Sequence, residues 1–144
     1  MRYLHPTDAT ARALIARRID GPILMLNLLR FRAEADYAAT PQLAPEAPVS
    51  GAEAYGRYSR EITPLLEATG GAVIFEAEGG GWFIGPEAEH WDRVLIVRQA
   101  SLQSFFAFAG DPAAQTALAH RTAALADSRL LPMAAGLPFT ASAP

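Results

Sequence analysis

Two segments of this chain are apolar on both of their alternating faces, and this feature constrains the fold more than any other. They are Ile23–Phe31 and Arg93–Arg98. A strand with one face in water alternates apolar and polar residues, whereas a strand covered on both faces does not. We therefore expect these two segments to be the central strands of a sheet.

Helices are expected before the first of these strands and between the others. Apolar spacing and capping residues predict them over Asp8–Ile19, over Tyr55–Thr69, from Ser101 to Phe108 and from Pro112 to Leu125. Pro64 lacks a backbone donor, so it predicts a kink or a restart of the second helix near Ser59 to Thr63.

Two further strands and a long loop complete the pattern. Val73–Glu78 reads as a strand that Gly79–Gly81 is expected to break or bulge, and Arg129–Met133 reads as an edge strand because of Pro132. The proline-rich segment Ala33–Ser50 shows no periodic pattern and is expected to be a loop, such as a lid.

After the N-terminal helix, the order is β-α-β-β-α-β, the pattern of the ferredoxin-like fold. That α+β fold has an antiparallel sheet whose first and third strands are central. These are the two strands that are apolar on both faces, so pattern and topology agree. The 144 residues suit a single domain, with an N-terminal helix extension (1–21), a core (22–134) that contains the loop 33–50, and a tail (135–144).

Helices cover only one face of a ferredoxin-like sheet, which leaves the other face in need of cover. In the third strand, Val94 and Ile96 alternate with Leu95 and Val97, so neither face is expected to be solvated. The simplest cover is a second copy packed sheet against sheet, and we therefore expect a homodimer.

Two absent residue types exclude several function classes. The chain has no cysteine, and all 12 of its basic residues are arginine. These counts exclude disulfides, thiolate metal sites, Schiff-base chemistry and a Walker-type phosphate loop. His5, His90 and His120 lie too far apart in sequence for metal-ligand spacing, so we expect no metal site.

Charge and apolar content restrict the partners. The net charge is −3, and the densest basic clusters are Arg17-Arg18 and the pair Arg30 and Arg32, which is not the pattern of a nucleic-acid-binding protein. The longest apolar run, Ile23–Leu29, is too short to span a bilayer, and the first 19 residues do not resemble a signal peptide. We expect a soluble cytoplasmic protein with no membrane partner.

Several short motifs occur together in this chain. They are Met25–Phe31, Gly51–Tyr55 with Tyr58, Gly70-Gly71, Trp91-Asp92, Asp111-Pro112 with Gln115, and His120-Arg121 followed by Leu125–Leu131. In this combination, over roughly Pro22 to Met133, the chain resembles the family called domain of unknown function 1330, in the dimeric α+β barrel superfamily. It departs from that family at Ala114, where an aromatic residue is common.

The resemblance implies a dimer of ferredoxin-like subunits, each with a pocket between sheet and helices. The superfamily includes cofactor-independent monooxygenases, haem-degrading enzymes and lactone isomerases, and the family itself has no agreed chemistry. The resemblance therefore implies a fold and a pocket but no particular reaction.

Two polar residues in apolar surroundings are candidates for binding a ligand. Asn27 lies in the middle of a buried strand and must be hydrogen-bonded, either within the protein or to a ligand. Arg121 falls on the apolar side of its helix and needs an anion, either a ligand carboxylate or a protein partner such as Asp127 or Asp92.

Three aromatic residues complete the first set of candidates. Tyr55 and Tyr58 lie three residues apart on a helix and are expected to face the sheet, with hydroxyl groups that can reach the rim of a pocket. Trp91 begins a strand at a turn, where it lines a cavity or plugs the end of the barrel.

A second set of candidates consists of Arg30, Glu76, Trp82, Asp92 and His120. Glu76 and Glu78 share one strand face, either as a carboxylate pair or as part of a solvated face. His120 could act as a general base, although a surface position is the simpler expectation, and it points about 100° away from Arg121 on the helix.

Haem is the less favoured alternative, and no cofactor is expected. Haem-degrading relatives use an asparagine of the first strand together with a tryptophan and a histidine. Trp82 and His120 are the available counterparts in this chain, but their spacing in the sequence matches that pattern poorly. The sequence therefore predicts a small-molecule-binding protein. One hypothesis is a cofactor-independent oxygenase or isomerase of a small organic acid or aromatic compound, and the alternative is a non-catalytic ligand-binding or sensing dimer.

Overall fold

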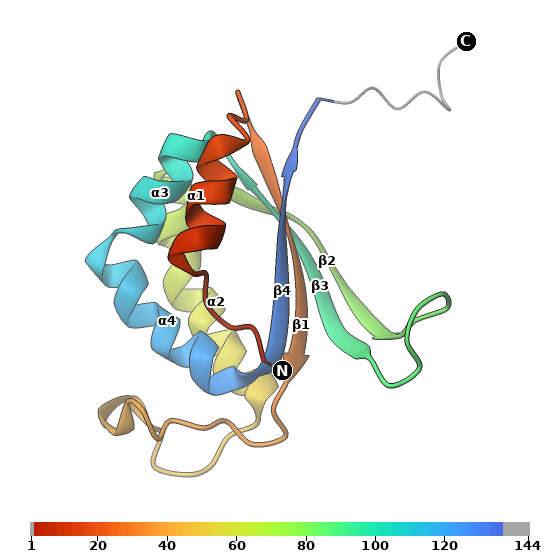
Figure 1. Ribbon diagram of the computed structural model, residues 1–144. Helices are drawn as coiled ribbons and strands as arrows, with labels where there is room; N and C mark the ends of the chain where they lie inside the picture. The colour runs from red at the N-terminus through yellow and green to blue at the C-terminus, as the bar shows by residue number, and fades with distance from the viewer. Residues whose placement is uncertain (1, 137–144) are drawn as a thin grey trace.

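A four-stranded antiparallel sheet in the order β2-β3-β1-β4 organises the structure, a computed structural model that describes residues 2–136. The strands are β1 (Ile23–Phe31), β2 (Ala72–Gly81), β3 (His90–Gln99) and β4 (Leu125–Ala134). The helices are α1 (Asp8–Ala16), α2 (Gly51–Ala68), α3 (Leu102–Ala109) and α4 (Pro112–Ala124), with a short 3₁₀ turn, η1 (Pro41–Leu43). All the helices lie on one side of the sheet (Figure 1).

The ferredoxin-like fold predicted from the sequence is confirmed. The two strands that are apolar on both faces, β1 and β3, occupy the two central positions, and β4 lies at the edge as Pro132 indicates. The N-caps also form as expected: Ser101 accepts from the N–H of Ser104, and Asp111 from the N–H of Ala113.

The predicted break at Gly79–Gly81 is wrong. β2 continues through Gly81, where Gly80 pairs with Trp91, and the register shift lies instead between Val73 and Phe75. The physical reason lies at Gly79, where a Cβ atom would collide with the carbonyl oxygen of Trp91. Glycine at this position lets the two strands approach closely, so it preserves the pairing that it was expected to interrupt.

The predicted restart of the second helix at Pro64 is also wrong. α2 runs unbroken for 18 residues with Pro64 inside it. Pro64 removes a single backbone hydrogen bond, whereas Ile62 and Leu66 on either side of it are buried. Tertiary packing of this apolar face keeps the helix continuous.

The N-terminal helix ends earlier than Ile19. It begins after the predicted cap Thr7 and stops at Ala16. Arg18 has a positive φ of 49°, a conformation outside the helical region, and this terminates α1.

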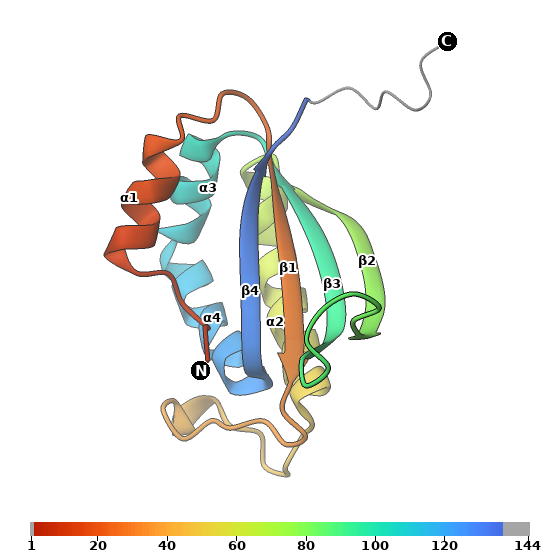
Figure 2. The ribbon, with the colours of Figure 1, turned by 45° about the vertical axis from the view of Figure 1, so that its right-hand side comes forward.

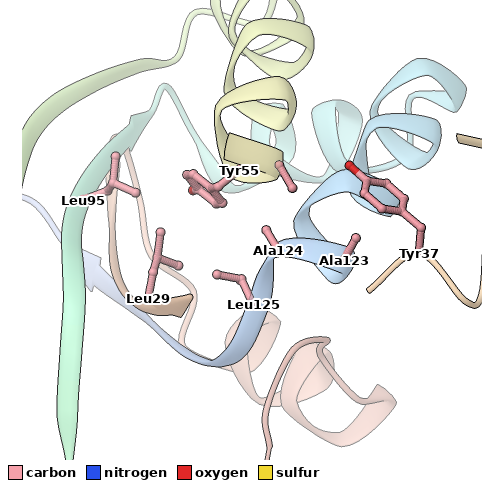
Figure 3. Packing of buried hydrophobic residues seen from close by; sticks show 8 residues of the cluster. Leu29, Tyr37, Tyr55, Leu95, Ala123, Ala124 and Leu125 are labelled. Atoms are coloured by element: carbon pink, nitrogen blue, oxygen red, sulfur yellow. The ribbon is translucent and has the colours of Figure 1, made fainter. Parts of the chain in front are cut away.

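The main core lies between the sheet and the helices α2 and α4. Leu29 and Leu95 project from the strands towards Tyr55 of α2, while Ala123 and Ala124 of α4 lie on the side of the cluster nearer to Tyr37 (Figure 3). The small side chains of α4 allow it to lie close to α2. This packing fixes the direction of the side chains at the C-terminal end of α4.

The opposite face of the sheet carries no helix (Figures 1 and 2). In the described residues, 2–136, no helix is both long and apolar enough to cross a membrane. The segment 33–50 is a loop as predicted, apart from the single turn η1.

Candidate functional site

Arg121 lies in the last turn of α4 and is only 8% exposed. Its Nη1 atom donates to the carbonyl oxygen of Leu4 at 2.8 Å, and Nη2 donates to Oγ of Ser128 at 3.4 Å. Within residues 2–136, no carboxylate forms an ion pair with this guanidinium. The interior therefore holds a positive charge that neutral groups alone satisfy.

Both carboxylates proposed from the sequence as partners of Arg121 are engaged elsewhere. Asp127 pairs with Arg30 at 3.5 Å and with Arg129 at 2.8 Å. Asp92 accepts a hydrogen bond of 2.8 Å from the backbone N–H of Phe31. Alternation along β4 turns Asp127 to the face opposite Ser128, which accounts for the failure of the expected pairing with Arg121.

Tyr55 and Tyr58 of α2 lie in the electric field of Arg121. Burial raises the pKa of both phenols, and the positive charge of Arg121 opposes this rise in each case. The two rings pack against each other with centroids 5.3 Å apart. In the described part of the chain, neither hydroxyl has a hydrogen-bond partner.

Asn27 lies on the helix side of β1 and is 8% exposed. Its Nδ2 atom donates to the carbonyl oxygen of Met25 on the same strand at 3.1 Å, which supplies part of the hydrogen bonding expected of a buried amide. Its neighbour on β4, Leu130, shares this face and is 46% exposed. The helices thus leave the sheet partly uncovered beside Asn27.

Arg93 and Glu76 border the same group from β3 and β2. The guanidinium of Arg93 lies 4.9 Å from the ring centroid of Phe31 and 3.7 Å from the Glu76 carboxylate. Glu76 therefore pairs with an arginine, and its 51% side-chain exposure agrees with the solvated-face alternative.

Trp91 belongs to a different cluster, which we call the arginine cluster: Arg30, Trp91, Asp127 and Arg129. The indole of Trp91 is 2% exposed and lies 5.8 Å from the guanidinium of Arg30 and 5.0 Å from that of Arg129. This geometry fits the plug that was one of its two predicted roles.

The carboxylate of Asp127 holds the arginine cluster together. Burial alone would raise the pKa of Asp127, but hydrogen bonds from the N–H of Tyr3, the side chain of Arg129 and the N–H of Ser128 lower it below its ordinary value. Asp127 therefore serves a structural role as an anion at neutral pH.

The expectation of a surface position for His120 is wrong. His120 is 7% exposed, with Nδ1 at 2.7 Å from the hydroxyl of Tyr37 and Nε2 at 2.9 Å from the carboxylate of Glu61. Tyr37 comes from the long loop, which folds over α4 and covers the histidine. No periodic pattern in that loop could have indicated this contact.

The trio considered for haem gains no support. Both ring nitrogens of His120 are engaged by protein groups, and Trp82 lies in the β2–β3 turn, where it is 43% exposed and donates to Glu89 at 3.1 Å. His120 and Arg121 also have different neighbours, as their helical angle predicts.

No family model matches the chain, and no curated protein matches it. A solved structure of RPA0582, a protein of unknown function from Rhodopseudomonas palustris, is 36% identical over 96% of this chain and 100% of that one, with a TM-score of 0.82. The chain belongs to the RPA0582 family.

A second RPA0582 structure, of the methylated protein, aligns with a TM-score of 0.84 at 36% identity over 96% of this chain and 98% of that one. A dimeric ferredoxin-like protein of unknown function from Bacteroides fragilis aligns at 13% identity with a TM-score of 0.40, over 81% of this chain and 98% of that one. RPA0582 is itself a protein of unknown function, so the role of the site is inferred from its own residues.

One residue near the site in this RPA0582-family chain was missed by the sequence analysis. His5, in the N-terminal segment, lines a surface hollow of about 340 Å³ together with Asp36, Thr40, Gln115 and Thr122. Burial lowers the pKa of His5, and the charges of Arg121 and Arg2 lower it further. The segment that carries His5 has no motif. Its backbone is held beside α4 and β4 by Arg121, which donates to the carbonyl oxygen of Leu4, and by Asp127 and Ser128, which bond to the backbone of Tyr3.

Proposed function

We propose that this RPA0582-family chain binds a small organic carboxylate between its helices and its sheet, with Arg121 as the anchor for the anion. The observation that carries the proposal is the buried guanidinium of Arg121, which has no carboxylate partner within residues 2–136. Asn27, Tyr55 and Tyr58 are the proposed neighbours of the ligand.

The energetics support an anionic ligand. Removing a charge from water costs several kcal/mol unless an opposite charge compensates it. The carbonyl of Leu4 and the hydroxyl of Ser128 are dipoles without net charge, and they occupy two of the five N–H donors of Arg121. A ligand carboxylate would compensate the charge and use the remaining donors.

The tyrosines support an aromatic or oxygen-bearing acid. Their rings offer a flat apolar surface, and their hydroxyl groups offer donors that no protein group in the described residues uses. Since the pKa of each phenol is raised, both remain neutral at physiological pH and act as donors.

This protonation state bears on the two functional hypotheses. An isomerase that abstracts a proton needs a base near the ligand, and a neutral phenol with a raised pKa is a poor base. The imidazole of His120 is held by Tyr37 and Glu61 and shares no hydrogen-bond partner with the guanidinium of Arg121. These observations favour binding or sensing, and an oxygenase in which the substrate supplies the electrons is the second candidate.

We also propose that two copies pack through the bare face of the sheet, as in the dimeric α+β barrel superfamily that includes domain of unknown function 1330. β1 presents Leu24, Leu26 and Leu28 to this face by alternation with its buried residues. On the outer strands, Phe75 is 50% exposed and Leu131 is 54% exposed. Burying such a surface would favour association.

A calorimetric titration tests the ligand proposal. Benzoate and acetate are compared with benzamide and acetamide, which have the same shape without the charge. We expect the acids to bind and the amides not to bind, and we expect Arg121→Gln to abolish binding. Arg60→Gln, a change of an exposed arginine on α2, is the matched control and should bind normally.

Because Arg121→Gln also removes the bond to Leu4, a second variant protects the test from a folding defect. Tyr58→Phe removes a hydroxyl without a protein partner, and it should leave stability unchanged while weakening benzoate binding several-fold. Equal binding of acids and amides, or undiminished binding by a folded Arg121→Gln variant, would contradict the proposal.

A further inference from the structure

The turn between β2 and β3 exposes large apolar side chains to an unusual degree. Phe83 is fully exposed and Ile84 is 87% exposed, while neighbouring Trp82 is 43% exposed. The hairpin projects away from the helices, on the side of the sheet that carries no helix (Figure 1). We call Phe83 and Ile84 the hairpin tip.

Contacts within the turn hold the hairpin tip in place. The indole N–H of Trp82 donates to the carboxylate of Glu89 at 3.1 Å. The ring of Trp82 also lies directly against Gly85, where an added Cβ would collide with it. The turn is thus braced by Trp82 from within, and this bracing directs Phe83 and Ile84 outward.

Two glycines beside the turn have no explanation within one copy. A Cβ atom at Gly80 or Gly81 would meet no atom within 4 Å, and neither glycine has a positive φ. Glycine inside a strand weakens it and commonly marks a place where another backbone approaches closely. No such backbone comes from the described residues of the same chain.

The size of the bare sheet face suggests what this second backbone is. Strands of 10 residues extend about 33 Å, and four strands span about 19 Å, so the face offers roughly 600 Å². A stable interface buries about 800 Å² on each partner. A fully exposed aromatic residue adds about 150–250 Å², so the hairpin tip extends the face to the required size.

We propose that the hairpin tip clasps a second copy of this chain, with Phe83 and Ile84 packed on the partner and with the partner's backbone passing close to Gly81, which alternation along β2 places on the bare face. This inference rests on the sheet-to-sheet dimer proposed above. The hairpin also carries the acidic residues Glu78, Glu87 and Glu89, which would repel an anionic lipid surface. Its charge therefore disfavours membrane insertion as the purpose of the exposed tip.

Sedimentation equilibrium of the full chain tests the clasp. The variant Phe83→Ser/Ile84→Ser should weaken dimerisation by about 100-fold or more, because both copies lose their clasp. Ile15→Ser removes a 52% exposed apolar residue from α1, on the helix side, and should leave dimerisation unchanged. Urea unfolding should show the same monomer stability for the tip variant, since the tip makes no core contact.

A local probe gives an independent readout. The chain contains no cysteine, so Ile84→Cys creates a single labelling site for the fluorophore bimane. We expect the emission of this label to shift to the blue as the protein concentration rises through the dimerisation range. The same label at Ile15→Cys should show no shift.

The possible outcomes distinguish failure of the hairpin-tip proposal from failure of the sheet-to-sheet dimer proposal. A dimer that Leu26→Arg disrupts, but that the tip variant and the label leave unchanged, would overturn the clasp and leave the sheet interface standing. A wild-type chain that remains monomeric would overturn both. Wild-type monomers that bind phosphatidylcholine vesicles, and lose this binding in the tip variant, would assign the tip to a membrane instead and also overturn the clasp.

Discussion

The hydroxyl oxygen of Tyr37 lies 2.7 Å from Nδ1 of His120, and this contact attaches the long loop to the helix layer. The other ring nitrogen of His120 reaches Glu61 of α2, so a single buried imidazole joins the loop, α4 and α2. This arrangement explains why a loop of such length, with a single 3₁₀ turn, lies against the body of the protein.

Removal of the Tyr37 hydroxyl should loosen the loop. We expect Tyr37→Phe to lower the free energy of unfolding by about 1–3 kcal/mol, because it leaves a buried ring nitrogen of His120 without its partner. Urea denaturation measures the change, and limited proteolysis should show faster cleavage within 33–50. Tyr58→Phe, whose hydroxyl has no partner in the described residues, is the control, and equal losses in both variants would disprove this role of Tyr37.

The fit between β2 and β3 requires glycine at 79 and not at 80. Gly79→Ala should destabilise the chain by about 1–3 kcal/mol, because its methyl group would meet the carbonyl oxygen of Trp91. Gly80→Ala has open space in one copy and should leave the monomer as stable as before. Thermal unfolding of dilute samples compares the two, and a Gly79→Ala variant as stable as Gly80→Ala would refute the close approach.

Asp127 should make the protein sensitive to acid. Its pKa is lowered in the folded state by the hydrogen bonds from Tyr3, Arg129 and Ser128, despite the opposing effect of burial. A carboxyl with a depressed pKa stabilises the fold above its unfolded pKa of about 3.9, and this contribution is lost as the pH falls towards the folded value. Asp127→Asn should therefore be less stable at pH 7 and should lose less stability on acidification, as urea titrations at several pH values would show.

His5 should report on the charge of Arg121. Burial is the main cause of its lowered pKa, and the positive charges of Arg121 and Arg2 add to it. Neutralising Arg121, by Arg121→Gln or by a bound carboxylate, should therefore raise the pKa of His5. A histidine-selective NMR titration with and without benzoate measures this pKa. If neither Arg121→Gln nor benzoate changes the pKa of His5, the anion does not bind beside Arg121.

The sequence was sufficient for the features that depend on local pattern. The apolar runs of β1 and β3 predicted their central positions, and Ser101 and Asp111 predicted two helix starts. The position of His120 could not be predicted, since it depends on where Tyr37 of an aperiodic loop comes to lie. The effect of Gly79 was likewise predicted wrongly. A glycine in the sequence is compatible both with a break in a strand and with a close approach of two strands, and only the structure distinguishes them.

The candidate site was predicted in part. Arg121, Asn27, Tyr55 and Tyr58 were all named from their positions on apolar faces, and Arg121 influences the pKa of both phenols. Trp91 was grouped with them but packs in the arginine cluster instead. The position of Trp91 at the start of β3 did not show that its indole would pack against arginines of β1 and β4, which are distant in the sequence.

Native mass spectrometry in a mixture of small carboxylic acids and their amides tests the central claim most directly. We predict that each chain retains one acid and no amide, that Arg121→Gln retains neither, and that Arg60→Gln behaves as the wild type. A wild-type chain that takes up no acid, or that takes up acids and amides equally, would contradict the assignment of Arg121 as the anchor of a carboxylate ligand.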